Sequence, residues 1–181
     1  NFFYGQSLSN MLWNCTKLKK GSKILLHRVR NPENYGVAKL NSAGKIIKIV
    51  EKPKKIISNH AITGLYFFDN KVIEYAKNVK PSWRNELEIS CIQNSYLKNG
   101  TLRVENLNRG VTWIDAGTCD SLLMASNFIS TVEKMQTYKI SCPEEIAFKN
   151  GWINKEQLKN LAKPLEKSGY GQYLNRVVES L

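Results

Sequence analysis

Two hydrophobic periods divide this chain, and they constrain its fold more than any other feature. Runs with the period of two that is typical of β-strands fill the middle, whereas the 3.6-residue period of amphipathic helices prevails toward the end. Each element must bury its apolar side against another, so strands and helices in one chain pack as layers. The patterning predicts an α/β fold.

Apolar runs of strand length are bounded by turn-forming residues. Residues 37–40 and 45–52 flank the turn sequence 41–44, which predicts a β-hairpin. The period of two places Ile47, Ile49 and Glu51 on one face of the second hairpin strand. The other expected strands are residues 23–29, 61–69 and 101–107.

Helical spacing is clearest in the last third of the chain. The expected helices are residues 6–20, 71–77, 86–97 and 118–135, followed by a helical tail. Ser141 and Glu144 resemble a capping box at the start of that tail. The apolar stripe of 118–135 comprises Leu122, Ala125, Phe128, Ile129, Val132 and Met135, and the inward residues of the tail are Leu158, Leu161 and Leu165.

Composition excludes several classes of protein. The 181 residues fit one domain, or one domain with a small appendage. The four cysteines form no C-x-x-C pair, which disfavours a zinc site and is typical of reduced thiols in a cytoplasmic protein. No apolar run approaches the roughly 20 residues of a membrane span. The start has neither an initiator Met nor a signal-peptide pattern, so we expect the middle of a larger protein that has no membrane partner.

A formal net charge of +12 raises the question of nucleic-acid binding. The lysines are spread along the whole chain among many asparagines and isoleucines, a mixture that biased codon usage explains. No nucleic-acid-binding motif accompanies the short basic run 52–55. We therefore expect no nucleic-acid partner and keep a basic nucleic-acid binder as a minor alternative. Positive charge also attracts anionic substrates.

Two short motifs carry candidate chemistry at the ends of expected strands. Glu-Lys-Pro occupies 51–53, and Trp-Ile-Asp-Ala-Gly-Thr occupies 113–118. Open α/β sheets bind ligands at strand ends. A lysine can neutralise a phosphate and an aspartate can hold Mg²⁺, so Lys52 and Asp115 suggest phosphate-ester chemistry. The alternatives are a solvated lysine and an aspartate that caps a helix.

A longer series of motifs occurs in order along the chain. It comprises Asn-Phe-Phe-Tyr-Gly at 1–5, Glu-Asn-Tyr-Gly-Val at 33–37, Glu-Lys-Pro at 51–53, Ala-Ile-Thr-Gly-Leu-Tyr-Phe at 61–67, Glu-Leu-Glu-Ile at 86–89, Trp-Ile-Asp-Ala-Gly-Thr at 113–118, Cys-Pro-Glu-Glu-Ile-Ala-Phe at 142–148 and Tyr-Gly-Gln-Tyr-Leu at 170–174. The series resembles the glucose-1-phosphate thymidylyltransferase family of sugar nucleotidyltransferases. The resemblance implies a mixed sheet of the nucleotide-diphospho-sugar transferase type, with a β-rich sugar-binding part at 1–138 and a helical segment at 139–181.

The resemblance also implies a reaction and its cofactor. Family members join dTTP and glucose 1-phosphate to give dTDP-glucose and pyrophosphate, in the synthesis of dTDP-deoxysugars such as rhamnose. Lys52 would be catalytic and hold the sugar phosphate. Asp115 would be catalytic as the ligand of Mg²⁺. The implied substrate-binding residues are Asn1, Tyr35, Gly36, Glu51, Ile62, Thr63, Arg84 and Trp113.

Glu51 would accept hydrogen bonds from glucose hydroxyls, and Arg84 would approach the sugar phosphate. The family also has a second nucleotide site at a subunit interface, and family members are homo-oligomers (tetramers), which we expect here as well. Residues at matching positions for that site are Tyr4, Gly5, Arg109, Lys139 and Glu145.

The chain departs from the family pattern at several positions. Asn85 replaces a Gly, which asparagine can do where φ is positive. Cys91 replaces an Asp, and Cys119 replaces a His. For Cys119 we expect the role of a small, buried apolar residue. Ser9 and Lys149 replace the usual His and Arg of the second nucleotide site.

The Gly-rich loop that binds the triphosphate in the family has no counterpart in the sequence, so we expect the N-terminal nucleotide-binding part to be absent. The chain alone should therefore be inactive. The alternatives are a non-catalytic remnant or assembly module, and a relative that transfers uridylyl or cytidylyl groups.

Overall fold

The computed structural model describes residues 1–82 and 84–179. In chain order, its elements are β1 (Phe2–Tyr4), α1 (Leu8–Thr16), β2 (Ser22–Arg28), the 3₁₀ turn η1 (Pro32–Asn34), β3 (Gly36–Leu40), β4 (Ile46–Glu51), β5 (His60–Phe68), α2 (Val72–Lys77), α3 (Ile89–Lys98), β6 (Leu102–Asn106), β7 (Thr112–Ile114), α4 (Cys119–Gln136), α5 (Pro143–Lys149), α6 (Lys155–Ala162), the 3₁₀ turn η2 (Lys163–Leu165) and α7 (Gly169–Glu179).

A mixed sheet forms the centre of the first part of the chain, which confirms the predicted fold class. Its order is β4-β3-β5-β2-β6. The pair β2–β6 is parallel, and the other pairs are antiparallel. A separate two-stranded antiparallel sheet joins β1 to β7 and pairs Tyr4 with Thr112.

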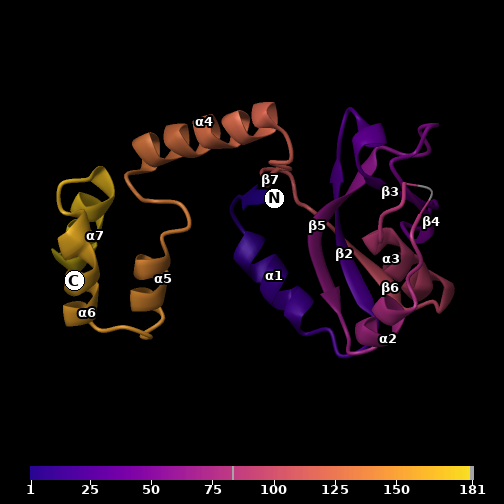
Figure 1. Cartoon of the computed structure of the whole chain (residues 1–181), viewed down its shortest axis with the longest axis horizontal. Helices are drawn as coiled ribbons and strands as arrows, with labels where there is room; N and C mark the ends of the chain where they lie inside the picture. Colours follow the sequence, from indigo (N-terminus) through magenta and orange to yellow (C-terminus); the bar gives the residue numbers. More distant parts are fainter. Residues whose placement is uncertain (83, 180–181) are drawn as a thin grey trace. The chain divides into compact units, whose positions relative to one another are not determined.

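The alternation of side chains along β2 fills both faces of the sheet. Ile24 and Leu26 lie in one buried cluster with residues of β3, β4 and β5, and Leu97 of α3 packs against that cluster. Leu25 points the other way and packs with Met11 and Cys15 of α1. Figure 1 shows α1 and α3 on opposite sides of the sheet. The apolar run of β2 is thus the run of a strand buried on both faces.

The predicted hairpin is confirmed, but the predicted face of its second strand is wrong. Ile49 is 5% exposed and Ile46 is 9% exposed, whereas Ile47 is 54% exposed. The β3–β4 register shifts between Lys39 and Leu40, which pair with Lys48 and Ile46 respectively. A bulge of this kind adds one residue to the strand and resets its alternation. Ile46 therefore takes the inward position that strict alternation gave to Ile47.

Contacts divide the chain into two compact units, Asn1–Leu122 and Leu123–Leu181, so the division falls inside α4 and earlier than the expected residue 138. The second unit has its own buried cluster, in which Leu158, Leu174 and Cys142 are almost fully buried. Leu161 and Leu165 are 45% and 37% exposed, so the prediction that they point inward is wrong.

The capping box predicted at Ser141 is absent. Ser141 has φ +55°, outside the extended region that an N-cap residue adopts, and Cys142 takes the N-cap position without a side-chain cap. The Glu144 carboxylate instead accepts a hydrogen bond from the Tyr170 hydroxyl. A capping box does form at α6, where Asn154 and Gln157 exchange hydrogen bonds of 2.9 and 2.8 Å.

Helix α4 forms where it was predicted, but most of its apolar stripe is not buried. Ala125 is buried, whereas Leu122 and Met135 are 56% and 79% exposed. A hydrophobic stripe identifies the side of a helix that can be buried, while burial itself depends on a packing partner. Among the helices of residues 1–82 and 84–179, none is long and apolar enough to cross a membrane.

Candidate active site

A cleft of about 210 Å³ opens in the first unit where several strand ends meet. Its wall brings together residues from before β1 to after β7. Residues that line it are Asn1, Asn34, Tyr35, Gly36, Glu51, Lys52, Ile62, Gly64, Tyr66, Ile89, Gln93, Trp113 and Asp115. The two motifs singled out in the sequence, 51–53 and 113–118, thus both contribute to one cleft.

Lys52 and Asp115 are the two oppositely charged side chains in this wall that lack a polar partner. Within the described residues, neither side chain forms a hydrogen bond or an ion pair with another protein group. Lys52 has φ +40°, and its backbone N–H donates to the carbonyl of Tyr35 at 3.0 Å. A lysine in this left-handed conformation is unusual, and strain of this type occurs at functional sites.

Glu51 ends β4 beside Lys52. Burial raises the pKa of the Glu51 carboxyl, and the nearby Glu88 carboxylate adds to that rise, while a hydrogen bond from Ser90 and the charge of Lys52 oppose it. Gly36 pairs with Glu51 across the hairpin. A Cβ at Gly36 would lie 2.9 Å from Glu51 Oε2, so glycine makes room for the carboxylate at this position.

Aromatic side chains form one wall of the cleft. The rings of Tyr35 and Trp113 lie 5.2 Å apart between centroids, and His27 meets the edge of Trp113 at 5.8 Å. The Trp113 indole N–H donates to Asn1 Oδ1 at 2.8 Å. The Asn1 side chain lies directly over Gly64, where a Cβ would approach Asn1 Nδ2 to 2.1 Å. Trp113 is therefore fixed in the wall and does not belong to the apolar core.

Alternate residues of β5 face the cleft. Ile62, Gly64 and Tyr66 line it, while the intervening Thr63 is fully buried and its hydroxyl donates to the Leu25 carbonyl at 3.2 Å. The period of two therefore directs the Thr63 side chain away from the cleft. Burial raises the pKa of the Tyr66 hydroxyl, as do the charges of Glu51 and Asp115, so this hydroxyl stays protonated at neutral pH.

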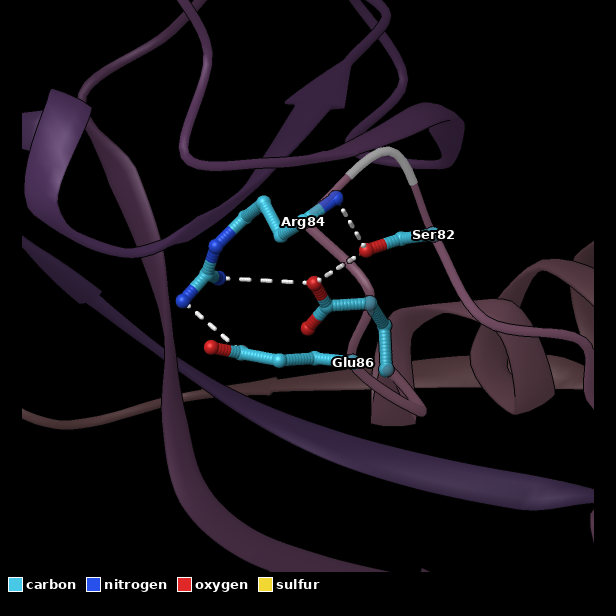
Figure 2. Close-up of polar contacts among 4 residues, drawn as sticks. Ser82, Arg84 and Glu86 are labelled. Atoms are coloured by element: carbon cyan, nitrogen blue, oxygen red, sulfur yellow. Dashed lines mark hydrogen bonds and ion pairs between the residues drawn. The ribbon is translucent and has the colours of Figure 1, made fainter.

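Arg84 does not line the cleft. Its guanidinium forms ion pairs with Glu86 at 2.8 Å and with Glu88 at 3.4 Å. Ser82 completes the network, because its hydroxyl donates to Glu88 at 2.9 Å and accepts from the Arg84 backbone N–H at 3.1 Å. Figure 2 shows the guanidinium turned toward both carboxylates. In this arrangement its charge is already matched by protein groups.

The loop before α3 differs from the sequence expectation. The helix begins at Ile89 and not at Glu86, because the backbone at Asn85 and Glu86 turns back to hydrogen-bond with Ser82. Asn85 has φ +60°, as expected for a residue that replaces glycine. Glu88 is the N-cap residue and is 9% exposed.

Cleft residues that the sequence did not single out for the site are Asn34, Gly64, Tyr66, Ile89 and Gln93. Gln93 has a recognisable signal. It stands one turn after Ile89 and next to buried Ile92, on the buried side of α3 that also carries Ser90 and Tyr96. A polar residue at a buried helical position requires either a partner or a ligand.

The residues matched to the second nucleotide site fall in both units. Gly5 lies against the Gly110 carbonyl in the first unit, so Tyr4, Gly5 and Arg109 are near one another. In the second unit, Lys139 forms an ion pair with Glu133, and Glu145 pairs with Lys149 at 2.6 Å and accepts a hydrogen bond from Tyr173. A nucleotide-binding role for these residues stays a prediction.

The cysteines are free thiols in the described structure. Cys15 and Cys142 are buried, Cys91 is partly buried, and Cys119 is exposed. The prediction of a buried Cys119 is therefore wrong, because α4 presents its first turn to solvent. Within residues 1–82 and 84–179, no cluster of three or more His, Cys, Asp or Glu side chains could hold a metal ion by itself.

The raised pKa of Glu51 leads to a prediction about stability and binding. The Glu51 carboxyl has a higher pKa in the folded chain than in the unfolded chain. Its contribution to stability is therefore fully present below the pKa of the unfolded chain and is lost as pH rises through the pKa of the folded chain. We expect Glu51→Gln to raise the free energy of unfolding at pH 7 and to leave it unchanged at acid pH. The same change should weaken the binding of a hydroxyl-bearing ligand in the cleft by about tenfold, because a charged acceptor is lost.

Urea unfolding at both pH values and a chemical-shift titration would check this expectation. Glu33→Gln is the matched control, since Glu33 is exposed and lies outside the cleft. A less stable Glu51→Gln at pH 7, or unchanged affinity, would contradict the expectation.

The cleft thus holds an unpaired lysine after β4 and an unpaired aspartate after β7, charges that suit a phosphate group and a divalent cation respectively. The sequence model of the Nucleotidyl transferase family matches residues 1–132. The chain therefore belongs to the nucleotidyl transferase family.

Relatives agree with this placement. The chain is 44% identical over 179 residues to a glucose-1-phosphate thymidylyltransferase of Neisseria meningitidis and covers 62% of it. It is 46% identical to the enzyme of the same name in Xanthomonas campestris, of which it covers 61%, and 45% identical to that of Mycobacterium tuberculosis, of which it covers 62%. In each case 99% of this chain is matched, so it spans about three-fifths of these relatives.

Solved structures show the same fold. A glucose-1-phosphate thymidylyltransferase from Bacillus anthracis, crystallised with sucrose, matches 70% of this chain and 50% of its own length, with a TM-score of 0.60 and 42% identity. An apo UDP-glucose pyrophosphorylase matches 72% of the chain with a TM-score of 0.57 and 22% identity. The second match supports the fold alone.

Proposed function

We propose that this chain is the sugar-phosphate-binding portion of a glucose-1-phosphate thymidylyltransferase. The observation that carries the proposal is the cleft, in which Lys52 and Asp115 face one space without protein partners of their own. In the reaction, an oxygen of the sugar phosphate attacks the α-phosphorus of dTTP. A new P–O bond forms, the bond between the α-phosphorus and the bridging oxygen breaks, and pyrophosphate leaves with the electron pair of that bond.

The residues of this chain would act mainly by positioning the sugar phosphate. The Lys52 ammonium neutralises the phosphate, which lets two anions approach each other. The Glu51 carboxylate accepts hydrogen bonds from sugar hydroxyls. Tyr35 and Trp113 form a wall that shields one side of the sugar from water. Holding the reacting groups in line accounts for a large part of such catalysis.

Mg²⁺ is the cofactor that the family implies, and the residues present fit it in part. Asp115 offers a partly buried carboxylate without a protein partner. Mg²⁺ is bound in many proteins by one or two carboxylates together with substrate phosphates and water. When bound, the ion would neutralise charge on the phosphoryl oxygens. Asp115 would contribute one ligand, and substrate oxygens would contribute others.

Further parts of the proposal rest on the family. They are a role in dTDP-rhamnose synthesis, a cytoplasmic location, assembly into a homo-oligomer, and a second nucleotide site at Tyr4, Gly5, Arg109, Lys139 and Glu145. The sequence lacks a Gly-rich triphosphate loop, whose backbone N–H groups distant side chains cannot replace. We therefore propose that the 181-residue chain alone binds the sugar phosphate without catalysing transfer.

A pyrophosphate-release assay on the full-length protein tests the function. With dTTP, glucose 1-phosphate and Mg²⁺ we expect turnover, and with UTP or CTP we expect less. Absence of turnover with every nucleoside triphosphate would refute the enzyme, and a preference for UTP or CTP would refute the thymidylyl assignment. The 181-residue chain, assayed in parallel, should show no turnover.

A further inference from the structure

The cleft wall contains one buried polar atom that nothing in the described chain satisfies. Gln93 is 1% exposed, and its Nε2 atom has no hydrogen-bond partner within residues 1–82 and 84–179. The other such atom is Ser22 Oγ, which lies away from the cleft. An unpaired buried amide lowers stability, so its retention in a wall that faces a cleft calls for an explanation.

We propose that the side-chain amide of Gln93 donates a hydrogen bond to a hydroxyl oxygen of the sugar bound in this cleft. The inference rests on the proposed function and adds a specificity-determining residue to it. A hydrogen bond to the ligand would give the Gln93 amide the partner that it lacks within the described protein.

The chemistry of the wall favours a hydroxyl as the partner. Glu51 and Asp115 are acceptors, and Lys52 is the charged donor suited to phosphate. A sugar hydroxyl both donates and accepts, so its oxygen needs a donor, which the carboxylates cannot supply. Asn34, Tyr35 and Tyr66 of the wall are neutral donors as well, but Gln93 is the one whose buried N–H group has no partner in the described chain. Gln93 adds a neutral N–H donor beside Ile89, in the helix that packs against β4, the strand that ends at Glu51.

The geometry allows the amide to reach the ligand. Gln93 belongs to α3, so its backbone is fixed by helical hydrogen bonds. The last torsion of a glutamine side chain is broad. Rotation about this torsion reorients the amide without moving the helix.

The test is a chemical-shift titration of the 181-residue chain with glucose 1-phosphate, combined with thermal unfolding. We expect Gln93→Met to unfold at the same or a higher temperature and to bind about tenfold more weakly. Ser22→Ala is the matched control, because it removes the other unpaired buried atom, and it should leave binding unchanged. Lys52→Ala serves as the control for phosphate binding.

Deoxy analogues of glucose 1-phosphate identify the hydroxyl. The analogue that lacks the hydroxyl contacted by Gln93 should bind to wild type and to Gln93→Met with equal affinity. The inference alone fails if Lys52→Ala weakens binding and Gln93→Met does not, or if every analogue is weakened equally by Gln93→Met. A lower unfolding temperature together with weaker binding would show a structural role and also overturn it. If wild type does not bind glucose 1-phosphate, both the inference and the proposed function fail.

Discussion

On the proposed function, replacing Lys52 with asparagine will lower kcat/KM of the full-length protein for glucose 1-phosphate by about 100-fold, because a charge-assisted contact to phosphate is lost. Asparagine is the informative choice. Lys52 has φ +40°, and asparagine tolerates this left-handed conformation better than most residues do. The substitution therefore removes the charge and preserves the backbone turn at the end of β4. Steady-state pyrophosphate release measures the change.

Lys55→Asn is the matched control for this prediction. Lys55 belongs to the same basic run as Lys52, is exposed, and does not line the cleft. It also tests the role of overall positive charge, since both variants reduce the net charge equally. Equal losses in both variants would show that long-range attraction, and not the position of Lys52, accounts for the effect.

The sequence predicted the strands of the hairpin and the place of Lys52 at a strand end because both depend on local patterns. The hairpin 37–52 has a turn between two apolar runs, and its far end must carry Glu51 and Lys52 to a strand end. The motif at 113–118 overlaps the end of β7, a short strand that lies outside the predicted strand ranges. Lys52 follows a strand of the five-stranded sheet, whereas Asp115 follows β7 of the separate pair with β1. The long-range pairing of β1 with β7 therefore takes part in bringing Asp115 to the cleft that Lys52 lines.

The errors have physical causes that local patterns do not record. A bulge between Lys39 and Leu40 shifted the alternation of β4 and exposed Ile47. Glu144 had the spacing of a capping box but formed a hydrogen bond with Tyr170, which is distant in sequence. In both cases a tertiary or cross-strand interaction overrode a valid local signal.

The site itself shows the same limit. Arg84 looked like a phosphate ligand, but its charge is matched by Glu86 and Glu88. Gln93 carried a signal, a polar residue one turn after Ile89 and next to Ile92, yet only the fold shows that this side of the helix meets a cleft. Sequence patterns locate polar residues well, and they cannot reveal which of these residues already have partners.

On the proposed function, replacing Asp115 with asparagine will lower the Mg²⁺-dependent kcat of the full-length protein by about 10²–10³-fold, the range seen when one group that stabilises transition-state charge is removed. Asparagine keeps the shape of the side chain and removes its charge, so the apparent affinity for Mg²⁺ should fall with kcat while glucose 1-phosphate still binds through Lys52 and Glu51. Asp120→Asn is the control, since Asp120 is exposed in the first turn of α4 and outside the cleft. Titration of Mg²⁺ at saturating substrates separates the two effects. An Asp115→Asn variant with normal kcat and normal Mg²⁺ dependence would show that this carboxylate does not hold the ion.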